Sequence, residues 1–241
     1  MLDAMQWLAL IAMTVDHASK AFGYFENPLF LFLGRMALPL FALMLAAHVV
    51  HSQRFSLLLL RLLALTIASQ PGFYLFWGSA EHAMFGLGQQ WNVIATLTLG
   101  AIAVKLFMTK HYVMVLVPVS MSLFLDVDYG VFGVLLMTLY GFTQSELVSV
   151  ERREFVALPL STIIVIAPFV MTYHRYELSV ILSGTLGITI ACALFWWSWF
   201  NANDSIRESN HHNHVRIPAL LWRGFYPVHF WLIFSVAYFV Q

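Results

Sequence analysis

Long apolar runs separated by short polar breaks dominate the chain. A helix that crosses the hydrocarbon core of a bilayer needs about 20 mostly apolar residues, and about nine such runs follow one another here. They comprise residues 3–24, 28–50, 55–77, 91–108, 112–125, 129–142, 155–172, 178–200 and 217–240. The pattern therefore predicts an all-α protein, a polytopic integral membrane bundle of about nine transmembrane helices.

One transmembrane domain covering residues 1–241 is predicted, because no repeat, low-complexity tract or soluble domain interrupts the pattern. The longest polar stretch, 201–216, is too short to form a domain. The first run differs from a signal peptide: it begins with Asp3 instead of basic residues, contains Asp16 and His17, and has no small-residue cleavage site. We therefore expect it to remain as the first transmembrane helix.

Composition supports the membrane interpretation and excludes one class of function. Hydrophobic residues make up 61% of the chain and charged residues 10%, whereas soluble domains carry about 25% charged residues. The 12 basic and 12 acidic residues cancel, so the chain lacks the clustered positive excess that nucleic-acid binding requires. With Cys192 as its one cysteine, the chain cannot form an internal disulfide.

The basic residues predict the orientation, because cytoplasmic loops are enriched in Lys and Arg. With the N-terminus in the cytoplasm, only Lys20 and Arg175 fall at outer helix ends. The basic residues at inner loops or inner helix ends are then Arg54, Arg61, Lys105, Lys110, Arg152, Arg153, Arg207 and Arg216.

Several polar side chains fall inside the predicted spans, where they usually face the bundle interior and mark function. Pro39 cannot donate to the carbonyl of Arg35, so the second span should kink beside this arginine. The apolar runs on either side of Asp126 and Asp128, which we call the acidic turn, are only about 14 residues long, and this would recess the turn below the outer surface. We expect a polar funnel open to the outside, lined by Asp16, His17, Arg35, Asn92, Asp126 and Asp128.

These residue types suit acid–base chemistry. A histidine with a carboxylate can act as a general base, and the side chains of Arg35, Asn92 and Tyr129 can stabilise an oxyanion or donate a proton. Neighbours on a helix project about 100° apart, so Asp16 is not assumed to orient the His17 ring. The acid that assists His17 is expected to be one of Asp16, Asp126 or Asp128. The same groups would also suit a proton or ion pathway.

Other polar residues have simpler interpretations. Lys20, near a span end, is expected to snorkel to the interface. Arg35 is also suited to neutralising Asp16 or Asp128 as a structural partner. The cluster of His211, His212 and His214 lies among polar residues and is interpreted as solvated sequence, with no metal expected.

Five sequence blocks resemble the TraX family of F-pilin N-acetylases, and they occur in the same order along nearly the whole chain. The blocks are Asp16-His17; Gly34-Arg35-Met36-Ala37-Leu38-Pro39; Trp91-Asn92-Val93; Asp126 with Asp128-Tyr129-Gly130; and Phe225-Tyr226-Pro227-Val228-His229.

The resemblance implies a bacterial inner-membrane enzyme that transfers the acetyl group of acetyl-CoA to the N-terminal amine of processed pilin. His17 and Arg35 match the histidine and arginine of more distantly similar transmembrane acyltransferases, and Asp16 and Asp128 complete the expected catalytic set. The acceptor is expected to be bound by Asn92, Asp126, Tyr129, Tyr226 and His229. The CoA phosphates are expected near Arg54, Lys105, Arg152 and Arg153.

Two other functions stay open on the sequence alone. The same machinery could acylate a sugar hydroxyl of a surface glycan or lipid. A small transporter or proton channel could instead use Asp16, His17 and Asp128 as a relay. Direct transfer and an acyl-enzyme carried on histidine are equally compatible with the sequence.

Overall fold

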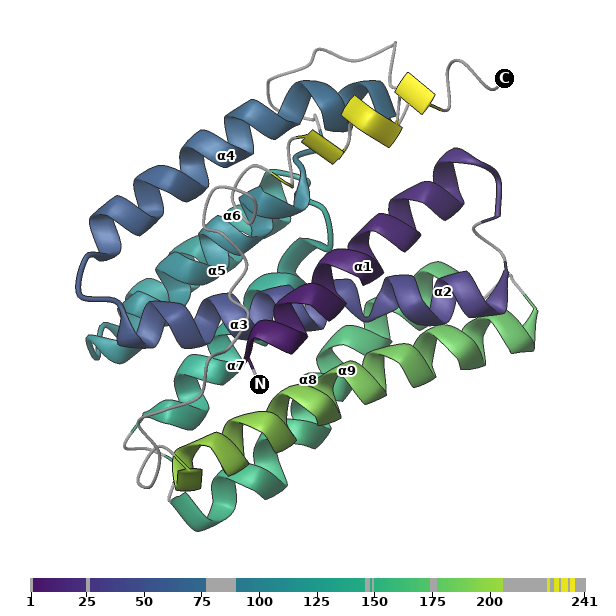
Figure 1. The fold of residues 1–241 in the computed structure, drawn as a ribbon. Helices are drawn as coiled ribbons and strands as arrows, with labels where there is room; N and C mark the ends of the chain where they lie inside the picture. Colours follow the sequence, from purple (N-terminus) through teal and green to yellow (C-terminus); the bar gives the residue numbers. More distant parts are fainter. Residues whose placement is uncertain are drawn as a thin grey trace.

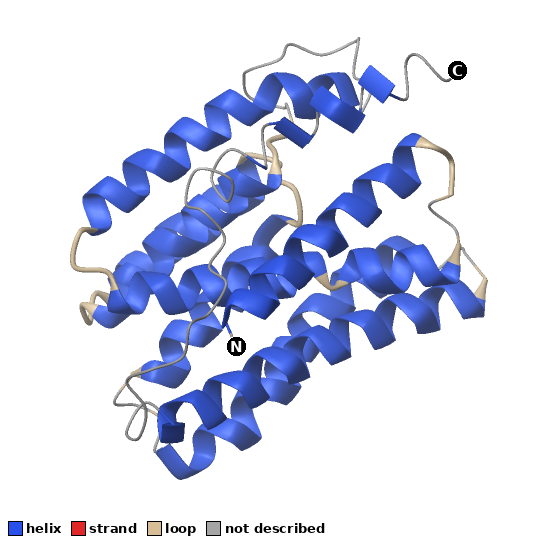
Figure 2. Ribbon diagram, in the orientation of Figure 1, coloured by secondary structure: helices blue, strands red, loops and turns tan. Residues whose placement is uncertain are grey.

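The computed structural model describes residues 2–24, 27–76, 90–145, 148, 150–173 and 177–205, and positions 225, 228–229, 231–233 and 235–236. Within these residues every named element is a helix (Figure 2). The elements are α1 (Leu2–Ala21), α2 (Pro28–Arg35), α3 (Ala37–His51), α4 (Phe55–Phe76), α5 (Val93–Met108), η1 (Tyr112–Val115), α6 (Leu116–Phe124), α7 (Gly130–Gln144), α8 (Val150–Tyr173) and α9 (Leu178–Ser205).

The helices follow the first eight predicted runs closely. Helix α8 begins five residues before its predicted start, and α9 extends to Ser205, five residues past its predicted end. The ninth run, 217–240, falls largely outside the described residues, as do Tyr226 and the histidine cluster at 211–214. The all-helical fold class is confirmed for the part of the chain that the structure describes.

The second predicted span is broken into two helices beside Arg35. Helix α2 ends at Arg35, Met36 lies between the helices, and α3 restarts at Ala37. Pro39 therefore falls in the first turn of α3, where the backbone N–H groups have no intrahelical acceptor and the missing proline donor costs nothing. The predicted kink is confirmed, and it leaves Arg35 at the end of a helix.

Helix α3 is the centre of the bundle (Figure 1). It packs against α1, α2, α5, α7 and α9, and most of its residues are buried. Helices α8 and α9 run side by side along one flank, while α4 packs on α5 at the opposite flank. The first helix lies against both α2 and α3, so its polar residues face the centre of the fold.

The two ends of the bundle can be told apart by contacts between helix termini. The His51 and Trp199 rings lie 5.8 Å apart, which brings the ends of α3 and α9 together. Lys105 Nζ lies 5.8 Å from the Phe55 ring centroid, so the end of α5 and the start of α4 share that end of the bundle. The chain crosses the bundle between the end of α1 and the end of α3, and again between the end of α5 and the turn before α7. The end of α1 and the turn before α7 therefore lie at the other end of the bundle.

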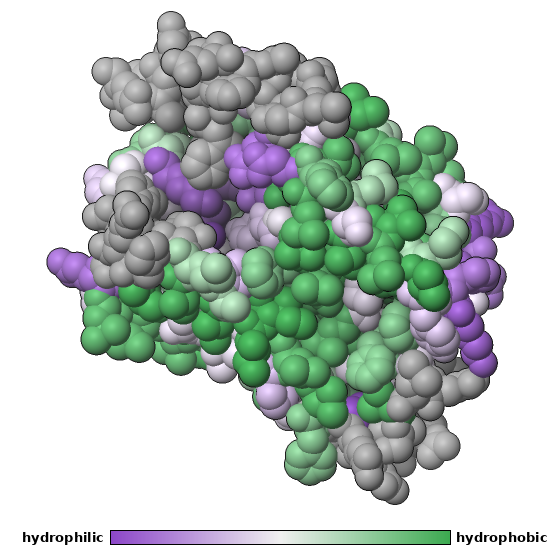
Figure 3. Space-filling model, turned by 180° about the vertical axis from the view of Figure 1, so that it is seen from behind, coloured by the Kyte–Doolittle hydropathy of each residue, from purple (hydrophilic) through white to green (hydrophobic). Residues whose placement is uncertain are grey.

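On the face shown in Figure 3, the surface of the described residues between these ends is mostly apolar. Large side chains such as Phe124 and Phe155 are more than 80% exposed, which would be unfavourable in water. In the described residues three helical segments are long and apolar enough to cross a membrane: Pro28–His51, Phe55–Tyr74 and Leu178–Phe200. Four shorter apolar helices accompany them: Val93–Met108, Tyr112–Phe124, Gly130–Gln144 and Phe155–Met171.

We expect Gly187→Ala to destabilise the protein. A Cβ at Gly187 in α9 would lie well inside van der Waals contact with the main-chain carbonyl of Phe32 in α2, so the helices would have to separate. Overpacking of this kind costs about 1–3 kcal/mol. Thermal unfolding of the detergent-solubilised protein measures the loss. The matched control is Gly141→Ala, whose Cβ would lie an ordinary 3.5 Å from Val104, and equal melting temperatures for the two variants would contradict the close packing.

Candidate active site

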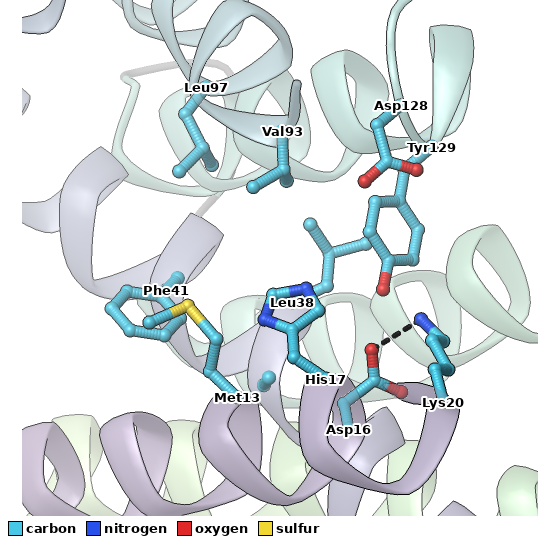
Figure 4. A pocket seen from close by; sticks show the side chains of 11 residues that line it. Met13, Asp16, His17, Lys20, Leu38, Phe41, Val93, Leu97, Asp128 and Tyr129 are labelled. Atoms are coloured by element: carbon cyan, nitrogen blue, oxygen red, sulfur yellow. Dashed lines mark hydrogen bonds and ion pairs between the residues drawn. The ribbon is translucent and has the colours of Figure 1, made fainter. Parts of the chain in front are cut away.

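A small cavity lies where α1, α3, α5 and the turn before α7 meet (Figure 4). Its volume is about 50 Å³. It is lined by Met13, Asp16, His17, Lys20, Ala37, Leu38, Phe41, Val93, Leu97, Asp128 and Tyr129. Three predicted catalytic residues, His17, Asp16 and Asp128, are therefore brought together.

A larger cleft of about 750 Å³ adjoins the small cavity. Lys20, Leu38, Asp128 and Tyr129 line both spaces, so these four side chains form the boundary between them. The rest of the cleft is formed by Arg35, Gln90, the turn before α7, and residues of α6, α7, α8 and α9 that are apolar except for Ser122. The cleft is thus large enough for a substrate, and the small cavity lies at its inner end.

Asp16 is the buried anion of the site. Its carboxylate lies 2.5 Å from Lys20 Nζ through Oδ2 and 3.9 Å from Arg35 Nη2 through Oδ1. The carboxylate can be buried because two cations accompany it. Gly34 lets α2 approach this point closely, since a Cβ there would lie 2.8 Å from the Asp16 side chain. The glycine before Arg35 is therefore required by the ion pair.

His17 is paired with a second histidine from the far end of the chain. Its Nδ1 lies 2.8 Å from Nε2 of His229, and Nδ1 of His229 lies 3.1 Å from the carbonyl oxygen of Phe225. A carbonyl can only accept, so His229 donates through Nδ1 and, as a neutral ring, accepts through Nε2. His17 then donates through Nδ1, which makes its Nε2 the basic nitrogen.

Arg35 connects four helices at the edge of the site. Besides Asp16 of α1, its guanidinium reaches the Tyr129 hydroxyl next to α7, where Nη1 donates to the oxygen at 3.5 Å. It also lies over the Phe169 ring of α8, 5.6 Å from the centroid, in a cation–π contact. The side chain is only 9% exposed, so these contacts fix it in place.

The turn between α6 and α7 presents Asp128 and Tyr129 to the cavity. Val127 pairs with Trp91 in an isolated bridge, in which Trp91 N–H donates to Asp126 O at 3.0 Å and Asp128 N–H donates to Trp91 O at 2.8 Å. The Thr96 hydroxyl donates to the Asp128 carbonyl. Tyr129 adopts a left-handed backbone conformation with φ of 62°, which ends the turn and starts α7.

A family model described as TraX protein matches residues 1–237. The chain belongs to the TraX family. No curated protein and no solved structure matches it. The resemblance carried by the five sequence blocks is thereby confirmed for nearly the whole chain, and each block supplies at least one residue of the site just described.

One predicted site residue of this TraX family member lies elsewhere: Asn92 is a structural residue, not part of either cavity. Its Oδ1 accepts from Ile94 N–H at 3.0 Å and caps α5. Its Nδ2 donates to Thr66 O and to Gln70 Oε1, both at 2.9 Å. With both ends of the amide engaged and no exposure, Asn92 ties α4 to α5 instead of polarising a substrate.

The interpretation of Lys20 as a snorkelling anchor is wrong. Its Nζ turns inward to Asp16 rather than outward to the interface, and the side chain is 17% exposed. The i, i+4 spacing of Asp16 and Lys20 was the sequence signal for this pair. The partner of His17 Nδ1 also differs from the expected carboxylate, because the structure places His229 Nε2 at that position.

The remaining predicted residues divide between the two ends of the bundle. Asp126 is exposed and lines the larger cleft, with Arg35. Arg54 precedes α4 and Lys105 is in the last turn of α5, so they lie at the end opposite the cavity, where they were expected to bind CoA. Arg153 lies in the first turn of α8, and its charge acts on the Tyr140 side chain of α7. The Arg152 side chain lies outside the described residues.

We expect Asn92→Ala to lower the free energy of unfolding by about 2–4 kcal/mol, from a lost helix cap and two lost buried hydrogen bonds. Asn92→Asp keeps the oxygen that caps α5 but cannot donate to Thr66 or Gln70, and it adds a buried charge. We therefore expect Asn92→Asp also to lower the free energy of unfolding. Thermal unfolding in detergent measures both variants. Wild-type stability in Asn92→Ala would refute the structural role.

Proposed function

We propose that this TraX family member is a membrane-embedded acetyltransferase that moves the acetyl group of acetyl-CoA to the N-terminal amine of a processed pilin or similar exported peptide. The observation that carries the proposal is the His17–His229 pair at a small cavity beside a buried carboxylate and two cations. Family membership adds support for a conjugation-related, pilin-associated role. The long apolar helices support a position in a membrane, here proposed to be the bacterial inner membrane. The distribution of Lys and Arg supports an N-terminus in the cytoplasm.

The first step of the proposed reaction is capture of the acceptor amine. Asp128 lines both the cleft and the small cavity, so its carboxylate can hold an incoming ammonium at their boundary. An amine attacks only as the neutral species, and Nε2 of His17 accepts the proton that it loses. His229 acts as a positioning residue in this step, because it holds the His17 ring in the tautomer that leaves Nε2 basic.

In the second step the amine nitrogen bonds to the thioester carbonyl carbon, and the carbon–sulfur bond breaks. Negative charge develops on the carbonyl oxygen, and the Tyr129 hydroxyl can donate to it while accepting from Arg35. Arg35 thus acts through Tyr129, since Tyr129 lines the small cavity and Arg35 lines the cleft. The proton held by His17 passes to the CoA thiolate, which leaves as the thiol. The neutral His17 ring then takes the second proton from the acylated nitrogen and releases it to water in the cleft.

The donor is proposed to approach from the opposite end of the bundle. The CoA phosphates are anionic and suit the basic residues Arg54, Lys105 and Arg153 at that end. The pantetheine arm would then enter the small cavity through the larger cleft, whose wall includes Val165 of α8 and Ile188 of α9. Acyl transfer through a histidine-bound intermediate would use the same residues, with His17 attacking the thioester first.

Membranes containing the protein should transfer label from [acetyl-¹⁴C]-CoA to a small pilin-like protein, identified by intact mass. His17→Ala should abolish this transfer, because the reaction loses its base. His51→Ala is the matched control, since His51 lies at the other end of the bundle against Trp199. Label on a glycan or lipid would change the acceptor to a hydroxyl. No label on any protein, lipid or glycan from folded protein would refute the acetyltransferase and favour transport.

His229→Ala should reduce kcat by roughly 10-fold or more, a part of the 10²–10⁴-fold that general-base catalysis supplies. His229→Gln should restore part of the activity, because its amide oxygen can accept from His17 Nδ1. In the wild type, acidification should lower the rate by protonating Nε2, and His229→Ala should alter this pH profile. A variant with lower stability but the wild-type pH profile and kcat would show that His229 only packs.

A further inference from the structure

The small cavity has two chemically different halves (Figure 4). Met13 and Phe41 lie on one side of the His17 ring, with Val93 and Leu97 beside them, and this half carries only apolar side chains. Asp128, Tyr129 and Lys20 lie on the other side, at the boundary with the larger cleft. A group seated beside His17 would therefore have an apolar wall on one side and polar partners on the other.

The cavity is small for the reactants that the cleft could admit. An apolar protein cavity of roughly 150 Å³ holds benzene, with about six heavy atoms. By that measure about 50 Å³ accommodates a group of two or three heavy atoms, the size of an acetyl group. The adjoining cleft of about 750 Å³ has no such limit. The size limit thus applies to the group that lies beside His17, and not to the part of a substrate that lies in the cleft.

The walls of the apolar half belong to the packed centre of the bundle. Met13, Leu38 and Leu97 are each less than 9% exposed, and they come from α1, α3 and α5. Helix α3 is held between its neighbours on all sides, so these walls cannot recede without separating packed helices. Room for a larger group has to come from the side chains themselves.

We propose that the apolar half is the acyl pocket and that Met13 and Phe41 determine the length of the acyl group that the enzyme transfers. This inference rests on the proposed acetyltransferase function and adds the residues that select the donor. With its carbonyl carbon beside His17, an acetyl group directs its methyl toward Met13 and Phe41. Each further methylene meets one of these two side chains. The polar half stays available to the acceptor amine.

The two side chains are suited to this task for different reasons. Met13 is buried and unbranched, so its thioether fills the space beside Phe41 closely. Phe41 is larger and rigid, and it closes the same side of the cavity from α3. Truncating either residue should extend the cavity away from the polar residues, without touching the Asp16 ion pair or the histidine pair.

The experiment compares acetyl-, propionyl- and butyryl-CoA as donors for the wild type, Met13→Ala and Phe41→Ala in the same membranes. A single methylene in an apolar pocket changes kcat/KM by roughly 10–200-fold. The wild type should therefore prefer acetyl-CoA over butyryl-CoA by roughly 100-fold or more. Each variant should narrow this preference at least tenfold, mainly through faster butyryl transfer. Phe41→Leu is a milder variant for use if Phe41→Ala fails to fold.

Met137→Ala is the matched control. It truncates a fully buried methionine that packs against Gly100 between α5 and α7, so it creates a core cavity away from His17. Its donor preference should equal that of the wild type. Equal use of acetyl- and butyryl-CoA by the wild type would overturn the inference, and so would folded Met13 and Phe41 variants that keep the wild-type preference. No transfer from any acyl-CoA would overturn the proposed function itself, and the acyl pocket with it.

Discussion

The buried carboxylate of Asp16 is the constraint on which the candidate site depends. A lone carboxylate among apolar helices is strongly unfavourable, so Asp16 has to be accompanied by cations. Lys20 supplies one from the next turn of α1, and Arg35 supplies the other from α2. The pairing requires the two helices to approach closely, and Gly34 permits it. The ion pair thus sets the position of α1, and with it the position of His17.

The break between α2 and α3 extends this arrangement to the rest of the bundle. Because α2 stops at Arg35, the guanidinium lies at a helix end, from which it reaches Tyr129 and the Phe169 ring. The same break lets α3 continue through the centre of the bundle with Pro39 in its first turn. The break between α2 and α3 therefore has two effects. It lets α3 form the central helix of the fold, and it places the guanidinium of Arg35 beside the polar side chains of the site.

The two ends of the molecule are suited to different parts of one reaction. In the proposed reaction, the acidic turn, the histidine pair and the small cavity at one end would provide an ammonium partner, a base and a limited acyl pocket. At the other end Arg54 and Lys105 offer charge for an anionic cofactor. A transferase that joins a cytosolic donor to an exported acceptor needs such a division, because its substrates arrive from opposite sides of the membrane.

The sequence alone determined the helical fold class, the limits of the described helices to within about five residues, and the gathering of Asp16, His17, Arg35 and Asp128. Apolar runs of membrane length and costly polar residues within them are local signals, readable without neighbours. Tertiary structure alone decided the other roles. Asn92 ties α4 to α5 because Thr66 and Gln70 accept from its amide, and His229 reaches His17 from over 200 positions away. Contacts between distant segments depend on helix packing, which no local pattern encodes.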